Sequence, residues 1–275
     1  MNYSNYRKLL KITNYRKTIA FLFTLVNILS AQVDQEIFFY RVNTLYYNLE
    51  NSKLNNFSCW ITSNVFEENI KELTLEEIFP LEITWVNPNR IFFIKRPLPS
   101  VQDTSLYKVM EELQLELLQE LKGILLDWQR YYGGKLLADL PDNYIYSADG
   151  DTISIEYEAI EESKNIKVKM NFNQDGLCTK IITKYYDSGQ KIFVYPIFNS
   201  FEGKFICTGW KVRISEGEAI ESGFDIRVNS RETDGYMLPD MIYMELQTKE
   251  HAQKRFIRIY KFRNVILNKK LQILN

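Results

Sequence analysis

Residues 166–214 read IKVKMNFNQDGLCTKIITKYYDSGQKIFVYPIFNSFEGKFICTGWKVRI, and this stretch decides the fold. Runs rich in β-branched and aromatic residues alternate with short Gly-containing turns at 173–176, 187–189 and 202–203. Connections this short join antiparallel neighbours, because a parallel pair needs a crossover of a dozen or more residues. The stretch therefore predicts an antiparallel meander of four strands, at 166–172, 177–186, 191–200 and 205–214.

The same pattern continues on both sides of the meander. Further strands are predicted at 57–66, 81–86, 91–96, 144–147, 152–159, 224–228, 241–248 and 256–267. Runs of strands interrupted by few helices indicate an α+β protein rather than a βαβ protein. No linker divides the chain after residue 31. We therefore predict a single α+β domain over 32–275, built on an antiparallel, curved sheet of about 11 strands.

Two helices are predicted to cover this sheet. The first opens the domain, with apolar residues at helical spacing: Phe38, Val42, Leu45 and Leu49. The second is long, spanning 103–132, with Asp103 or Thr104 as its N-cap and Gly133-Gly134 as a left-handed stop. Gly123 in its middle indicates either close approach of another backbone or a tolerated defect. Its apolar stripe is Leu106, Met110, Leu113, Leu117, Leu121, Ile124 and Trp128.

The first 31 residues have the layout of a secretory signal peptide. They carry five basic residues and no acid, followed by an apolar run at 19–29 and then Ser30-Ala31. The run is shorter than the roughly 20 residues that span a bilayer. We expect cleavage after Ala31 and a periplasmic location, with a secreted protein or an uncleaved N-terminal anchor as the alternatives. No cysteine stands at the expected cut to carry a lipid.

Removal of this segment makes the protein acidic. Loss of its five basic residues changes the formal net charge from −1 to −6. Nucleic-acid binding depends on a basic face that neutralises phosphates. We therefore expect no nucleic-acid partner.

The sequence contains no recognisable catalytic or metal-binding motif. The one histidine, His251, lies in a polar stretch with no partner placed near it, and the three cysteines lack CxxC spacing. Nucleotide-binding glycine loops and the GxSxG motif of serine hydrolases are missing as well. We predict no enzyme, no cofactor and no metal site. A converging carboxylate pair of the glycosidase kind is left as an alternative.

Cys178 and Cys207 are expected to be free thiols despite export. The turns at 187–189 and 202–203 place them on the outer two strands of a three-strand meander. Strands two apart are separated by roughly 9–10 Å, which exceeds the Cα spacing of about 4.4–6.8 Å that a disulfide accepts. Both thiols are expected to be buried as small apolar side chains.

Aromatic residues on the sheet and the long helix raise the question of a cavity. Trp60, Trp85 and Trp210 fall on predicted strands and Trp128 on the long helix. Core packing explains each of them. The sharper hypothesis is that the sheet and the helix enclose an apolar ligand cavity. Its lining would be one alternating strand face, Ile206, Trp210, Val212 and Ile214, together with Leu113, Leu117 and Trp128.

The layout also resembles a known superfamily. The quoted turns, the element Asp234-Gly235-Tyr236-Met237-Leu238-Pro239 and the closing strand at 257–262 resemble outer-membrane lipoprotein carriers of the LolA type and their lipoprotein-sorting relatives. The resemblance covers most of 33–267. It implies an unclosed half-barrel covered by helices, whose hollow receives acyl chains. The long helix at 103–132 is an insertion relative to this pattern.

Three functions follow as hypotheses. The first is a monomeric, periplasmic binding or carrier protein for an apolar ligand, with a lipid or an acylated protein as partner. The second is an envelope protein that binds or senses another protein through the same fold. The third is a secreted hydrolase with an unrecognised site.

Export gives a direct prediction about the N-terminus. Protein recovered from the cell envelope should begin at Gln32 or within a few residues of it, because the basic and apolar segments are removed on export. N-terminal sequencing or intact-mass measurement tests this. Intact Met1 on protein purified from the cytoplasm would contradict it.

Overall fold

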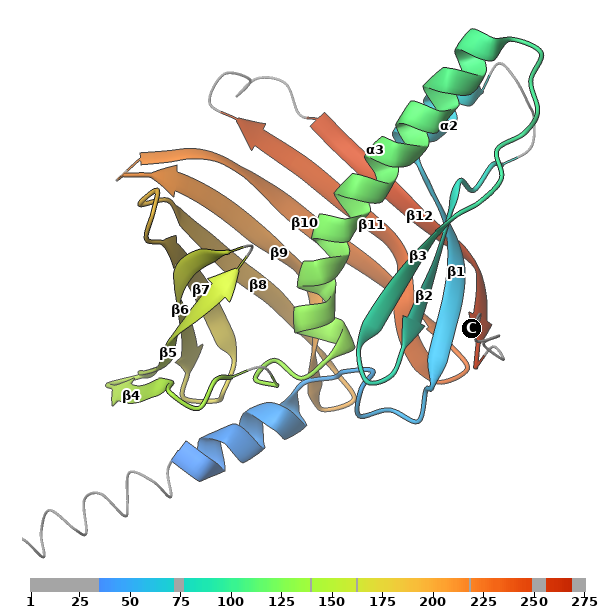
Figure 1. Ribbon diagram of the computed structural model, residues 1–275. Coiled ribbons are helices and arrows are strands. Elements are labelled where there is room, and N and C mark those ends of the chain that lie inside the picture. Colours follow the sequence, from blue (N-terminus) through green and yellow to red (C-terminus); the bar gives the residue numbers. More distant parts are fainter. Residues whose placement is uncertain are drawn as a thin grey trace, which may run out of the picture.

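The computed structural model describes residues 35–71, 77–138, 140–161, 163–217, 219–248 and 256–268. The predicted signal peptide and His251 lie outside these residues. All of the strands belong to one 12-stranded antiparallel sheet that does not close, in the order β3-β2-β1-β12-β11-β10-β9-β8-β7-β6-β5-β4 (Figure 1). The α+β class with a curved antiparallel sheet is therefore confirmed, with 12 strands where about 11 were expected.

The strands are β1 (Asn56–Ser63), β2 (Leu81–Val86), β3 (Arg90–Lys95), β4 (Ile145–Asp149), β5 (Thr152–Glu161), β6 (Lys164–Asn173), β7 (Cys178–Tyr185), β8 (Lys191–Phe201), β9 (Lys204–Glu216), β10 (Ala219–Thr233), β11 (Tyr236–Thr248) and β12 (Phe256–Leu267). Nine of these strands, β4 to β12, follow one another along the chain as a continuous meander.

The turns form where the sequence places them. In the turn between β6 and β7, Gly176 adopts a φ of +85°, a conformation that L side chains rarely take. The Asn173 side chain fixes the same turn by accepting a hydrogen bond from the backbone N–H of Leu177 at 2.8 Å. These local signals explain why the meander could be predicted.

Strands β10 and β11 are longer than the sequence indicates. The pairing changes from Asn229 with Met241 to Ser230 with Pro239, so Asp240 is an extra residue in β11. A bulge of this kind accommodates a proline within a sheet. Residues 236–240, which lie before the strand predicted at 241–248, are therefore part of β11.

The first predicted strand ends earlier than expected. It stops at Ser63, and a helix, α2 (Asn64–Ile70), follows at once. The Ser63 hydroxyl caps this helix by accepting a hydrogen bond from the Phe66 N–H at 3.2 Å. Phe66 and Ile70, four residues apart, are both buried.

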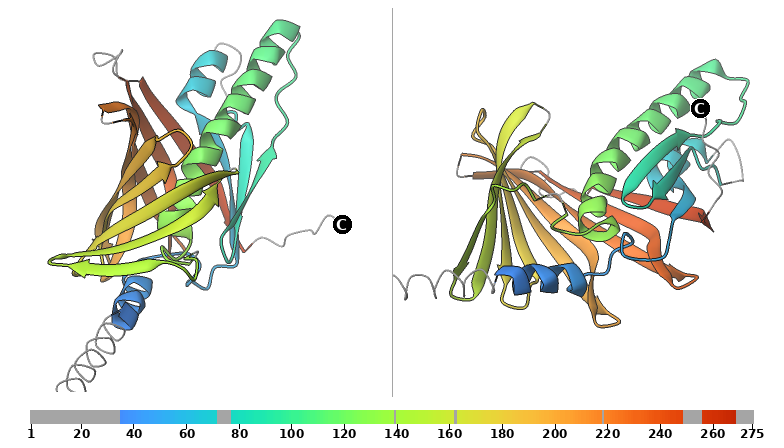
Figure 2. Two further views of the ribbon diagram at one scale, coloured as in Figure 1. Left: turned by 60° about the vertical axis from the view of Figure 1, so that its left-hand side comes forward. Right: turned by 60° about the horizontal axis from the view of Figure 1, so that its bottom comes forward.

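The long helix α3 (Thr104–Trp128) crosses the inner face of the sheet (Figures 1 and 2). Asp103 caps it as predicted, through its contacts with the N–H groups of Ser105 and Leu106. The expected left-handed stop is wrong. The helix ends instead in a π-helical turn, Gln129–Gly133, and Gly134 is extended with φ −119°. Its buried side chains are Met110, Gln114, Leu117, Leu121, Ile124, Leu125 and Trp128.

Gly123 supports the tolerated-defect interpretation. It is exposed, and a Cβ at this position would meet no atom within 4 Å. Ionic contacts tie the same helix to β12: Arg258 pairs with Glu116 at 2.8 Å, and the Tyr260 hydroxyl donates to Glu120 at 2.9 Å. The helix is therefore fixed over β12 by both apolar and polar contacts.

A helix over residues 35–45 lies across the ends of β6 and β7 (Figure 2). It buries Phe38, whose ring meets that of Phe172 edge-on at 5.3 Å. Just after it, the Tyr46 hydroxyl donates to the Gly176 carbonyl at 2.8 Å and accepts from the Cys178 N–H at 2.6 Å. The predicted opening helix is present, but it ends before Leu49. Within the described residues, no helix combines the length and apolar character needed to cross a membrane.

The predicted placement of the cysteines is confirmed. Cys178 lies on β7 and Cys207 on β9, with β8 paired between them. Both thiols are free and buried, as is Cys59. Burial raises the pKa of the Cys178 and Cys207 thiols to about 12, so they remain protonated at neutral pH.

Packing of α3 on the sheet generates a stability prediction. Leu117→Ala should lower the free energy of unfolding by about 2–5 kcal/mol, because this side chain is buried and its loss leaves a cavity. Leu115→Ala is the matched control, since Leu115 is 44% exposed on the same helix and should change stability by less than about 0.5 kcal/mol. Urea unfolding of both variants measures the difference. Equal effects would contradict the described packing.

Candidate functional site

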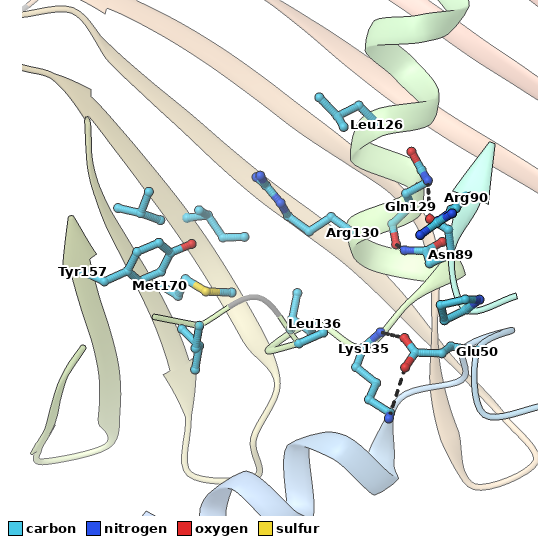
Figure 3. A pocket seen from close by; sticks show the side chains of 15 residues that line it. Glu50, Asn89, Arg90, Leu126, Gln129, Arg130, Lys135, Leu136, Tyr157 and Met170 are labelled. Atoms are coloured by element: carbon cyan, nitrogen blue, oxygen red, sulfur yellow. Dashed lines mark hydrogen bonds and ion pairs between the residues drawn. The ribbon is translucent and has the colours of Figure 1, made fainter. Parts of the chain in front are cut away.

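A pocket of about 490 Å³ lies between the end of α3 and the inner faces of β5, β6 and β7 (Figure 3). Its other walls are the β2–β3 turn and the segment that follows α3. Small-molecule sites commonly have volumes of about 300–1,000 Å³. The pocket therefore has the size of a ligand site.

Asn89, in the turn between β2 and β3, holds the end of α3 in place. Its Nδ2 donates to the Gln129 carbonyl at 3.1 Å, and the Gln129 Nε2 donates to the Asn89 carbonyl at 2.8 Å. The Asn89 Oδ1 accepts from the Trp85 Nε1 at 3.0 Å. A Cβ on Gly133 or Gly134 would overlap the Asn89 amide. The two glycines are thus required for close approach rather than for a left-handed turn.

Glu50 fixes the segment after α3 from the other side. Its carboxylate forms an ion pair with the Lys135 Nζ at 3.2 Å and accepts from the Lys135 backbone N–H at 3.3 Å (Figure 3). The Glu50 backbone N–H donates to the Gly133 carbonyl at 3.0 Å. Lys135 is therefore already neutralised by a carboxylate of the pocket lining.

The opposite wall of the pocket is apolar. Val168 and Met170 on β6 and Ile181 on β7 are buried and face the hollow, and Tyr157 on β5 stands beside them. The period of two along β6 causes this arrangement, because it turns Val168 and Met170 inward and the intervening Lys169 outward. Leu136 and Leu140 extend the apolar surface. This wall can hold a hydrocarbon group.

Arg130 projects into the pocket from the π-helical turn at the end of α3 (Figure 3). Its guanidinium forms no ion pair with a carboxylate of the described residues. Partial desolvation opposes its charge, but nearby Tyr131 and Asp127 raise the pKa of Arg130. Arg130 therefore presents a permanent positive charge opposite the apolar wall.

Asp127 lies one turn before Arg130 and faces the sheet. Burial raises the pKa of its carboxyl to about 6, against the lowering effects of Arg130 and Trp210 and with a smaller raising effect from Glu161 on β5. Tyr131 and the Cys207 thiol also lie close enough to interact with it. The Tyr131 hydroxyl and the Trp210 indole N–H form no well-aligned hydrogen bond within the described chain. Polar groups are thus enclosed here at an energetic cost.

The residues that the sequence nominated for a cavity lie elsewhere. Trp210, Val212, Ile206, Leu117 and Trp128 are each at most 5% exposed and belong to the packed core. Ile214 and Leu113 are half-buried, and Leu113 packs in a separate cluster with Phe66 and Met110. None of the seven lines the 490 Å³ pocket. Their role in binding a ligand stays a prediction.

A bulge breaks the expected strand face. Cys207 pairs with Phe198 and Gly209 with Ile197, so Thr208 is an extra residue in β9. One inserted residue interrupts the alternation of side chains between the two faces. Ile206 and Trp210 therefore do not belong to one continuous alternating row, as the sequence analysis expected.

Sequence reasoning missed Arg130 and Asn89. A basic residue near a helix C-terminus complements the helix dipole, so Arg130 reads as an ordinary surface residue. Asn89 reads as a turn residue. The available signal was the Gly133-Gly134 pair, because adjacent glycines at a helix end also mark close approach of another segment.

Comparison with known proteins finds no match among family models, curated proteins or solved structures. The geometry of the site is therefore the basis for assigning a function.

The raised pKa of Asp127 predicts a pH-dependent stability difference. Charged Asp127 destabilises the folded state above about pH 6, and this penalty disappears as the pH falls toward 3.8, the ordinary value. Asp127→Asn should therefore raise the free energy of unfolding by about 1–2 kcal/mol at pH 8. This is less than the free energy that corresponds to the whole pKa shift, because the side chain is partly solvated.

The difference between Asp127→Asn and the wild-type protein should shrink through pH 6 and vanish near pH 4. Urea unfolding of both proteins across this range measures it. Equal stabilisation at pH 4 and pH 8 would show that Asp127 is not buried as a charge.

Proposed function

We propose that this protein is an exported, non-enzymatic binding or carrier protein that holds an apolar ligand, such as a lipid or an acyl chain, in the pocket beside α3. The observation that carries the proposal is the apolar wall of the pocket, where Val168, Met170 and Ile181 form the edge of the hydrophobic core and line the hollow. Apolar surface left facing a hollow gains free energy when a hydrocarbon group covers it, at about 0.8 kcal/mol per buried methylene.

The pocket is built to keep its shape. The Asn89 and Glu50 contacts fix the end of α3 and the segment after it, and the β-ladders fix the opposite wall. A preformed pocket spares the ligand the cost of ordering the protein. This rigidity favours binding of a small molecule in the hollow.

The architecture supports the same proposal. An unclosed antiparallel sheet with helices on its inner face is what the resemblance to LolA-type carriers implies. A hollow inside such a half-barrel is the expected position of acyl chains. The periplasmic location belongs to this proposal and depends on the N-terminal segment.

A second candidate is protein recognition at the β3 edge of the sheet. Phe92 and Ile94 on this edge strand are 52% and 49% exposed. An edge strand with exposed apolar side chains is a template for pairing with another chain. This candidate predicts binding that is insensitive to substitutions in the pocket.

The carrier proposal predicts chain-length-dependent binding of neutral alkyl chains. Octanol, decanol and dodecanol should bind with affinity rising about fourfold per added methylene until the pocket is filled. Displacement of a neutral fluorescent probe, or calorimetry below the solubility limit of each alcohol, measures the affinities.

Two leucines of α3 provide a matched pair for this experiment. Leu126 is 59% exposed and lines the pocket, whereas Leu115 is 44% exposed and lies outside it. Leu126→Gln should weaken dodecanol binding about fivefold, through loss of about 1 kcal/mol of apolar contact, while Leu115→Gln should leave it unchanged. Absence of alcohol binding by the wild-type protein would refute the carrier proposal.

A further inference from the structure

The charges that line the pocket differ in sign from the chain as a whole. Arg90, Arg130 and Lys135 line it together with one carboxylate, that of Glu50, which gives a formal charge of +2. The whole chain carries −1. A cleft lined by charge of one sign concentrates ligands of the opposite sign.

Of these cations, Arg130 is the one placed opposite the apolar wall (Figure 3). Lys135 is held by Glu50, whereas Arg130 has no ion-pair partner in the part of the chain that the structure describes. The side chain extends away from its own helix end and across the hollow toward β5 and β6. The Tyr131 hydroxyl interacts with the guanidinium, whose other donors are available to a molecule in the pocket.

The nearest opposing charge is Asp127. It lies on the same helix one turn earlier and faces β9, and the pair does not form a salt bridge. Burial raises the pKa of Asp127 to about 6, so its charge is also weakened in mildly acidic conditions. Asp127 moderates the positive potential of the pocket without occupying the guanidinium.

We infer that the ligand is a single-chain amphiphile with an anionic head, a carboxylate or a phosphate, which Arg130 binds while the chain lies along Tyr157, Met170 and Ile181. The inference rests on the proposed function and names its ligand class. A guanidinium offers paired N–H donors that match the two oxygens of such a head. The volume of 490 Å³ lies in the lower half of the usual range, which favours one chain over several.

The test compares ligands with the same chain and different heads. Dodecanoate, dodecyl phosphate and dodecanol are titrated into the mature protein at pH 8, with the two anions below their critical micelle concentrations and dodecanol below its solubility limit. We expect at least one of the two anions to bind about 10- to 100-fold more tightly than dodecanol, as charge-assisted hydrogen bonds provide. Which anion binds more tightly identifies the head as carboxylate or phosphate.

Variants then assign the preference to Arg130. Arg130→Gln should remove the advantage of the anion and leave dodecanol within about twofold of its wild-type affinity, and Arg130→Lys should restore part of it. Arg227→Gln is the control, because Arg227 is exposed on β10 outside this pocket and should not alter binding. Thermal unfolding confirms that each variant is folded.

Each outcome decides a separate claim. Equal affinity of the wild-type protein for the anions and dodecanol would overturn the anionic ligand while leaving the apolar carrier intact. An anion preference that persists in Arg130→Gln would overturn the role of Arg130. Failure of the wild-type protein to bind dodecanol would refute the proposed function itself, because the apolar pocket is then not used.

Discussion

An antiparallel sheet that does not close leaves an apolar inner face that must be removed from water, and this constraint governs the rest of the structure. The helix α3 covers one part of that face and buries Leu117, Leu121 and Trp128 there. In the order of the sheet, this part runs from β1 through β12 and β11 to β10 (Figure 1). A single helix cannot cover a 12-stranded surface. The chain turns away at Gln129–Gly133, and the inner face of β5 to β7 therefore borders a pocket rather than a second covering helix.

The end of α3 is consequently the point at which packed core gives way to hollow. Asn89 determines where this point lies, because its amide bonds both to Trp85 of the sheet and to Gln129 of the helix end. Gly133 and Gly134 leave room for this amide, and a Cβ at either position would overlap it. The same contacts fix the helix end from which Arg130 projects, so a turn residue between β2 and β3 positions a charge in the pocket that this turn also lines.

The sequence allowed the meander, its strand order and the long helix to be predicted, because each depends on local signals: Gly-containing turns, alternation with a period of two and an apolar stripe. It did not allow the pocket to be located. The bulges at Thr208 and Asp240 shift the facing of side chains and leave no mark in composition. The alternation of apolar residues made Trp210 a candidate for the cavity, yet the end of α3 packs on it. Whether a strand residue faces the helix or the hollow depends on where the helix ends. That position is set by Asn89.

The helical turn that includes Asp127, Arg130 and Tyr131 is costly for folding. It encloses a carboxyl with a pKa of about 6 and a buried hydroxyl without a well-aligned hydrogen bond, and beside them stands the exposed Arg130, which has no ion-pair partner among the described residues. A buried polar group without a hydrogen bond costs on the order of 1–3 kcal/mol relative to a satisfied or apolar one. Groups that oppose stability and gather beside a pocket are a physical reason to assign a binding role to that pocket, and here they gather on the side of α3 that faces the uncovered strands.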